Sequence, residues 1–140
     1  MNYVVYLDAG AGELEKILSG IKTMIVKDFD PTHSITYSVS PGDSLYFLRN
    51  QDDYTLRVKA SVVRVLSFSN HFGEDLSYTL KEMQSRLQLT EDQYNYWSAK
   101  GQVLLVEFNS AHKISVIHID KTKITQPSDW ITFEEFSQVT

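Results

Sequence analysis

The stretch SGIKTMIVKD, from Ser19 to Asp28, contains the helix-to-strand transition on which the fold prediction depends. Apolar residues at helical spacing predict a helix from Glu13 to Ser19, and Gly20 ends it. The run of Met, Ile and Val then predicts a strand from Thr23 to Lys27. Because a β-branched and aromatic strand is also predicted from Tyr3 to Leu7, the chain opens as strand, helix, strand.

A loop and a hairpin follow this opening unit. Pro, Thr, Ser and His residues predict a loop from Asp30 to Pro41, and two strands are predicted at Ser44–Arg49 and Tyr54–Phe68. Apolar and polar residues alternate along the second strand until the adjacent pair Val62-Val63. The lost alternation predicts a bulge or bend there, of the kind that lets a long strand turn a corner in a small barrel.

The second half of the chain adds helices and more strands. Leucines and a methionine at spacings of four, three and four predict a helix from Asp75 to Leu87. Thr90 and Gln93 form a capping box that starts another helix, which Gly101 ends. The same kinds of signal predict strands at Gln102–Phe108 and Lys113–Ile119, joined by a turn, and a terminal helix capped by Thr132 and Glu135. We therefore predict an α+β fold, a small β-barrel of about six strands with a long bent central strand and flanking helices.

The composition excludes several kinds of site. The 140 residues fit a single domain, 1–140, and contain no cysteine, which excludes disulfides, thiolate nucleophiles and cysteine-ligated metals. The four histidines do not have the spacing of a metal-binding helix; they are His33, His71, His112 and His118. We expect neither a metal nor a cofactor.

Charge and the N-terminal sequence bear on partners and location. Thirteen Lys plus Arg residues against eighteen Asp plus Glu give a net charge of -5, so non-specific binding to duplex DNA is not expected. The opening MNYVVYLDAG has no basic leader, and its apolar run breaks at Asp8. We expect no signal peptide and no contact with a membrane, and hence a soluble cytoplasmic protein.

Two short motifs favour structural roles. Gly10-Ala11-Gly12 has the first two glycines of a dinucleotide fingerprint, but Glu15 stands where the third is needed. The motif therefore predicts a turn before a helix, whose early carboxylates favour the helix dipole. Tyr94 and Trp97 share a helix face and are assigned to core packing rather than to base stacking.

The order of elements around SGIKTMIVKD resembles the ASCH family of the PUA-like superfamily. The shared features are a helix ending in Gly-x-Lys-Thr, an extended segment closing in a basic residue, a loop, Pro-Gly-Asp, and a strand leading into a long valine-rich strand. They run from Leu14 to about Phe68, with Gln102–Phe108 as the expected closing strand. The resemblance implies a cleft between barrel and helices that binds RNA or nucleosides. One bacterial branch of the family resembles an amidohydrolase acting on acetylated cytidine.

The resemblance also implies ligand-binding residues. Lys22 would begin its strand at the mouth of the cleft, facing the helices of residues 75–97, with Thr23 beside it and Lys27 at the other end of the strand. Arg57 and Lys59, on the polar face of the long strand, would contact a nucleic-acid backbone. The alternative for Lys22 is a solvated lysine at a strand's first residue.

The sequence departs from the hydrolase branch of the family. That branch has an activated threonine three residues after the lysine, where this chain has Ile25, and an arginine where this chain has Lys27. Its glutamate partner has two candidates here, Glu74 and Glu82. We therefore favour a non-catalytic module that binds RNA or a modified nucleoside, with no catalytic residue assigned. A small amidohydrolase and a protein-interaction domain remain the alternatives.

Overall fold

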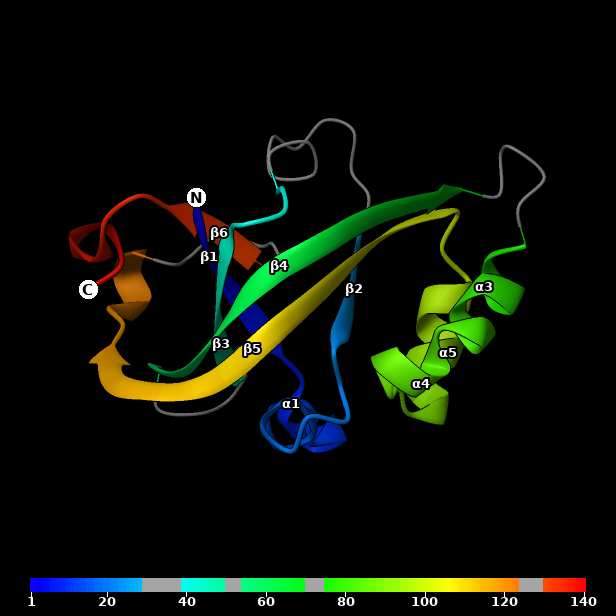
Figure 1. The fold of residues 1–140 in the computed structure, drawn as a ribbon, viewed down its shortest axis with the longest axis horizontal. Helices are drawn as coiled ribbons and strands as arrows, with labels where there is room; N and C mark the ends of the chain where they lie inside the picture. Colours follow the sequence, from blue (N-terminus) through cyan, green and yellow to red (C-terminus); the bar gives the residue numbers. More distant parts are fainter. Residues whose placement is uncertain (29–38, 50–53, 70–74, 124–129) are drawn as a thin grey trace.

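The computed structural model describes residues 1–28, 39–49, 54–69, 75–123 and 130–140 of the 140-residue chain (Figure 1). The strands in these ranges are β1 (Asn2–Leu7), β2 (Met24–Asp28), β3 (Ser44–Arg49), β4 (Thr55–Ser69), β5 (Gln102–His118) and β6 (Trp130–Phe133). The helices are α1 (Glu13–Leu18), α3 (Leu76–Glu82), α4 (Gln84–Leu87) and α5 (Glu91–Ser98), with 3₁₀ turns at Ala9–Ala11, Lys121–Lys123 and Phe136–Gln138.

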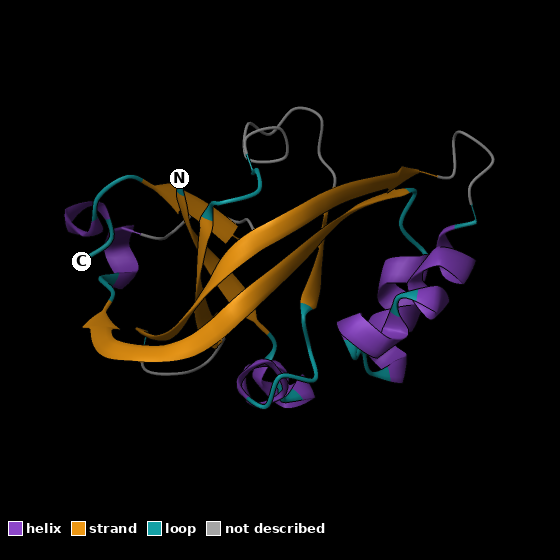
Figure 2. Ribbon diagram, in the orientation of Figure 1, coloured by secondary structure: helices purple, strands orange, loops and turns teal. Residues whose placement is uncertain are grey.

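All six of these strands belong to one sheet, in the order β2-β5-β4-β3-β1-β6. β1 and β3 are parallel, and the other neighbours are antiparallel. Figure 2 shows the sheet curling into a half-barrel, with α3, α4 and α5 gathered at one side of it. This arrangement confirms the predicted α+β class and the small barrel with flanking helices.

The long ribbon of β4 and β5 contains the predicted bend. The register between these strands shifts between Val62 and Arg64, which leaves Val63 as the extra residue of a bulge. Val62 is 3% exposed and packs inside the barrel, whereas Val63 is 43% exposed. The loss of alternation in the sequence therefore marked a real bulge.

Three element boundaries differ from the sequence predictions. The predicted turn between Gln102–Phe108 and Lys113–Ile119 is wrong, because residues 109–112 stay paired with β4 and a positive φ of 58° at Ser110 accommodates the irregular register. The helix predicted from Asp75 to Leu87 is divided at Met83 into α3 and α4. The short terminal helix begins later than predicted: Thr132 pairs with β1 within β6, and a 3₁₀ turn capped by Glu135 follows at Phe136–Gln138.

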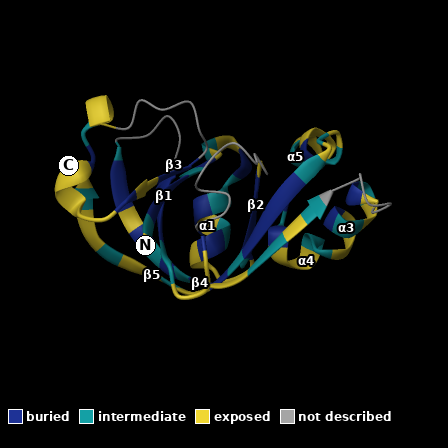
Figure 3. Ribbon diagram, turned by 90° about the horizontal axis from the view of Figure 1, so that it is seen from above, coloured by how far each residue is buried: buried dark blue, intermediate teal, exposed yellow. Residues whose placement is uncertain are grey.

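The described core has three clusters. Side chains from the strands and α1 fill the inside of the barrel, and a second cluster lies on the other face of β1, β3 and β6. The third is an outer cluster, in which one face of α3, α4 and α5 packs on the outside of β2 and β5. Figure 3 shows the buried residues following β1, β2 and β3. Trp97 belongs to the outer cluster together with Met24 and Leu80, so its assignment to core packing is confirmed. Within the described ranges, no helix is long and apolar enough to cross a bilayer.

The bulge gives a matched pair of adjacent valines for a stability test. We expect Val62→Ala to lower the free energy of unfolding by about 1.5 to 3 kcal/mol, because it removes buried methyl groups from the barrel. Val63→Ala should change it by less than about 0.5 kcal/mol, because its side chain is largely solvated. Urea unfolding of both variants measures the difference, and equal losses would contradict the bulge.

Candidate functional site

A pocket of about 360 Å³ lies between the barrel and α5. Three parts of the chain that are distant in sequence line it: the end of β1 with the start of α1, the strand β2, and the helix α5. The lining residues are Tyr6, Leu7, Asp8, Glu13, Ile25, Val26, Lys27, Asp92, Gln93, Tyr96 and Trp97. We call it the seam pocket, because it lies where the described strands do not close the sheet.

The seam arises from the ends of the sheet. β2 is a terminal strand that pairs with β5 alone in the described sheet, and the other terminal strand, β6, pairs with β1 only over Asn2–Val5. Lys27 bridges the remaining gap, since its buried ammonium donates a hydrogen bond to the carbonyl of Tyr6 at 3.0 Å. A side chain thus joins β2 to β1 where no backbone ladder does.

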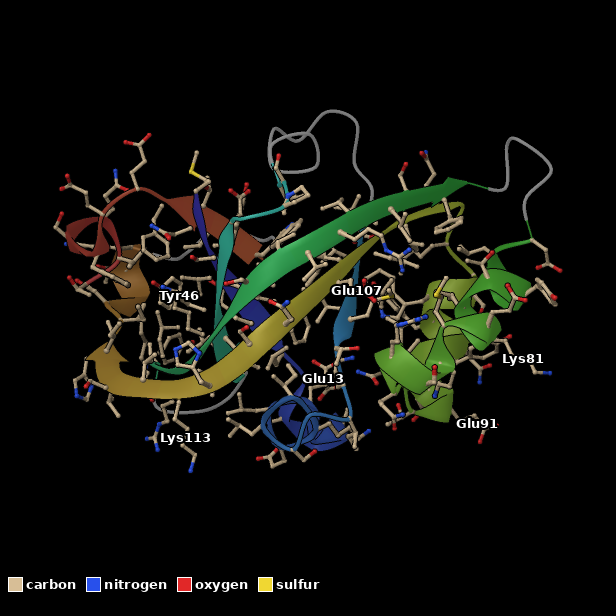
Figure 4. The ribbon with its side chains drawn as sticks, in the orientation of Figure 1. Glu13, Tyr46, Lys81, Glu91, Glu107 and Lys113 are labelled. Carbon is tan, nitrogen blue, oxygen red and sulfur yellow. The ribbon has the colours of Figure 1, made fainter. Side chains whose placement is uncertain are left out.

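A second link joins α1 to α5 across the pocket. The Nε2 group of Gln93 donates to Oε1 of Glu13 at 2.8 Å, and the amide of Asp8 donates to Oε2 of the same carboxylate at 3.0 Å. Oε1 of Gln93 accepts from the amide of Thr90 at 3.0 Å, which is half of the predicted capping box. Figure 4 shows Glu13 beside α1, near the lower end of β2. Glu13 and Gln93 are therefore held in fixed positions.

The pocket combines negative charge with an aromatic surface. Among its described lining residues, Asp8, Glu13 and Asp92 are carboxylates, and Lys27 is the single cation. Tyr96 is 55% exposed and stands edge-on to Trp97, with 5.0 Å between ring centroids. The ammonium of Lys100 lies over the Tyr96 ring, 4.7 Å from its centroid. The described lining therefore offers a partly exposed ring, hydrogen-bonding groups and more carboxylates than cations.

Lys22, which the sequence placed at the mouth of a cleft, is 1% exposed and lies outside the described pocket lining. Its ammonium donates to the carbonyl of Leu87, in the last turn of α4. The alternative of a solvated lysine is therefore wrong. The carbonyls on either side are bonded as well, Arg86 by the amide of Thr23 at 3.0 Å and Gln88 by the ammonium of Lys16 at 3.1 Å.

These contacts form a docking joint, which we define as Lys16, Lys22 and Thr23 bonded to the carbonyls of residues 86–88. The last carbonyls of a helix have no partner within it, and positive charge there is favourable. The pKa of Lys22 is lowered from its ordinary 10.5 to about 8, chiefly by burial; Glu13 opposes the shift, and Lys27 and Lys16 contribute to it. The docking joint thus fixes the helices against the start of β2, and burial of the charged Lys22 amine there costs folding free energy.

The remaining residues predicted for the site lie elsewhere. Arg57 is exposed on β4 and donates to Oγ1 of Thr55 at 3.0 Å. The ammonium of Lys59 lies 5.6 Å from the ring centroid of Tyr46, which Figure 4 shows well away from Glu13. Of the five predicted ligand-binding residues, Lys27 alone lines the described pocket, while Lys22 and Thr23 support it from the docking joint.

Of the two candidate glutamate partners, only Glu82 can be placed, and it is not part of the described pocket lining. Glu74 lies outside the described residues, as do His33 and His71, and Glu82 is exposed at the end of α3. No cluster of metal-ligating side chains is present in the part of the chain that the structure describes. Sequence reasoning missed the site roles of Asp8, Glu13 and Tyr96, although the capping box did mark the helix that carries Gln93.

The buried amine of Lys22 makes stability depend on pH in a predictable direction. Between about pH 8 and 10.5 the unfolded chain binds the proton that the folded chain has lost, so stability gains up to about 3 kcal/mol over this window as pH rises. We expect the parent to gain stability relative to Lys22→Met from pH 7.5 to 10, measured by urea unfolding. The exposed Lys81→Met on α3 serves as the control. A constant difference between parent and Lys22→Met would contradict the lowered pKa.

Comparison with known proteins supports the fold. No protein-family model matches the sequence, and no curated protein matches it. Among solved structures, the ASCH protein from Zymomonas mobilis is similar with a TM-score of 0.70 and 14% identity, over 98% of this chain and 91% of that chain. Two single-residue variants of that protein give TM-scores of 0.69 and 0.67 at 15% identity, over 96% of this chain and 91% and 89% of theirs. At this identity the likeness shows the fold alone, and the chain therefore has the fold of an ASCH domain, here a small α+β barrel.

Proposed function

We propose that this protein binds a nucleoside in the seam pocket and does not chemically alter it. One observation carries the proposal: the pocket combines an exposed aromatic ring, Tyr96, with the hydrogen-bonding side chains of Glu13 and Gln93, which hold each other in place. A volume of about 360 Å³ lies in the range of small-ligand pockets. Bases stack on such rings and are read along their polar edges. The ASCH resemblance, which implies RNA or nucleoside ligands, agrees with this choice.

The charge of the pocket favours a nucleoside over the backbone of an RNA. Three carboxylates face one ammonium in the described lining, and Lys27 already donates to Tyr6. A phosphate group brought into this field would be repelled, whereas an uncharged base with amine or imide donors would be accepted. Arg57 and Lys59 stay candidates for a backbone contact, on a separate surface of β4.

The chemistry near Lys22 favours binding over hydrolysis. Ile25, at the position of the family's threonine, is buried in the barrel interior and also lines the pocket. The described lining contains no serine, threonine or cysteine. The ammonium of Lys22 donates to the carbonyl of Leu87, whereas the resemblance implies that the hydrolases of the family pair their lysine with a threonine hydroxyl.

Removal of the aromatic ring tests nucleoside binding. We expect Tyr96→Ala to weaken the binding of the four common nucleosides about 10- to 100-fold, because one stacking surface is lost. The control is Tyr78→Ala, another exposed tyrosine that lies on α3 away from the pocket. Isothermal titration calorimetry measures both. The proposal fails if the parent binds no nucleoside, or if Tyr96→Ala binds as the parent does. Release of acetate from acetylated cytidine by the parent would instead establish the amidohydrolase alternative.

A second comparison tests the sign of the pocket's charge. Each nucleoside should bind about tenfold more tightly than its 5′-monophosphate at low salt, and this difference in affinity should be smaller at high salt. Asp92→Asn should reduce this difference in affinity. Glu91, its exposed neighbour, lies outside the seam pocket, so Glu91→Gln should leave the difference unchanged. Monophosphates or short RNAs that bind more tightly than nucleosides would show that the ligand contacts a basic surface instead.

A further inference from the structure

We propose that the bound base is read by the main chain of Val26, whose N–H and C=O groups point into the seam pocket from the free edge of β2. This inference rests on the proposed function and assigns the recognition element within it. The ligand class is a base that presents a hydrogen-bond donor and an acceptor side by side, as along the pairing edge of uracil.

The direction of the Val26 groups follows from the ladder between β2 and β5. Antiparallel pairs alternate between residues that exchange hydrogen bonds and residues that do not. The amide of Phe108 donates to the carbonyl of Thr23 at 2.9 Å, in the same register that pairs Ile25 with Val106 and Val26 with Leu105. Ile25 and Lys27 are therefore bonded to β5, and the N–H and C=O of Val26 point away from it.

The side chain of Val26 is buried in the outer cluster, together with Met24 and Trp97. Val26 nevertheless lines the seam pocket. Because the ladder leaves its N–H and C=O at the free edge of β2, we assign these main-chain groups as the part of Val26 that a ligand meets.

An unpaired strand edge inside a pocket needs polar partners. Main-chain N–H and C=O groups that lose water without another partner are costly, and strand edges commonly accept an added partner. Among the described residues no strand pairs with this edge of β2, since β5 occupies the other one. The N–H and C=O of one strand residue point the same way, so together they match an adjacent acceptor and donor on a base.

The neighbouring groups suit a base in this place. Tyr96 on α5 supplies the stacking ring, and Glu13 and Gln93 close the pocket from α1 and α5. On the same strand, Met24 also points its main-chain groups to the free edge but does not line the pocket. Met24 is therefore a matched internal control for Val26.

Amide hydrogen exchange, followed by NMR, tests the assignment directly. The full-length protein is measured alone and saturated with the tightest-binding common nucleoside. We expect the exchange of the Val26 amide to slow at least about tenfold on binding, with the Met24 amide changed less than about twofold. In calorimetric titrations, 3-methyluridine should bind at least about tenfold more weakly than uridine, and 5-methyluridine should bind with the same affinity as uridine.

The outcomes separate this inference from the proposed function. If the resonances of Gln93 and Tyr96 shift but Val26 exchange is unchanged, or if 3-methyluridine binds as well as uridine, the assignment to Val26 is overturned and the pocket remains the site. If no nucleoside shifts the resonances of Gln93, Tyr96 or Val26, the proposed function falls and this inference falls with it.

Discussion

The docking joint between the start of β2 and the last turn of α4 is the contact on which the rest of the site depends. Two ammonium groups and one amide, from Lys16, Lys22 and Thr23, satisfy three successive helix carbonyls. This contact holds the helices against β2, and through α5 it places Tyr96 at the pocket. A lysine at the start of an apolar strand is thereby explained, because its long stem crosses the core and its charge ends at helix carbonyls.

The second constraint is a sheet that stops short of closure. A fully closed barrel would pair β2 on both sides and leave no strand edge at the pocket. In the described part of the chain, the side chain of Lys27 reaches from β2 to the carbonyl of Tyr6, and the pocket lies beside it. The seam pocket therefore contains a strand edge, an ammonium that is already hydrogen-bonded to Tyr6, and three carboxylates. These groups suit an uncharged polar ring better than a phosphate.

Local sequence patterns correctly predicted the features of the fold that depend on residues close together in the sequence. The bulge at Val62-Val63 and the capping box of Thr90 and Gln93 are both present, because alternation and capping are local properties. The predicted turn in β5 is wrong, and the terminal helical turn begins later than Thr132, because pairing with distant strands overrode those signals. Of the residues that line the pocket, Lys27 was predicted from the sequence and Glu13 was not, because the hydrogen-bond partner of Glu13, Gln93, is eighty residues away in the chain.

The central claim is that a nucleoside binds in the seam pocket between β2 and α5. A crystal structure of the protein soaked with the tightest-binding nucleoside tests it most directly. The account predicts a base stacked on Tyr96 with its polar edge toward β2, next to Glu13 and Gln93. A nucleoside bound instead on the β4 surface near Arg57 and Lys59, with an empty seam pocket, would contradict it.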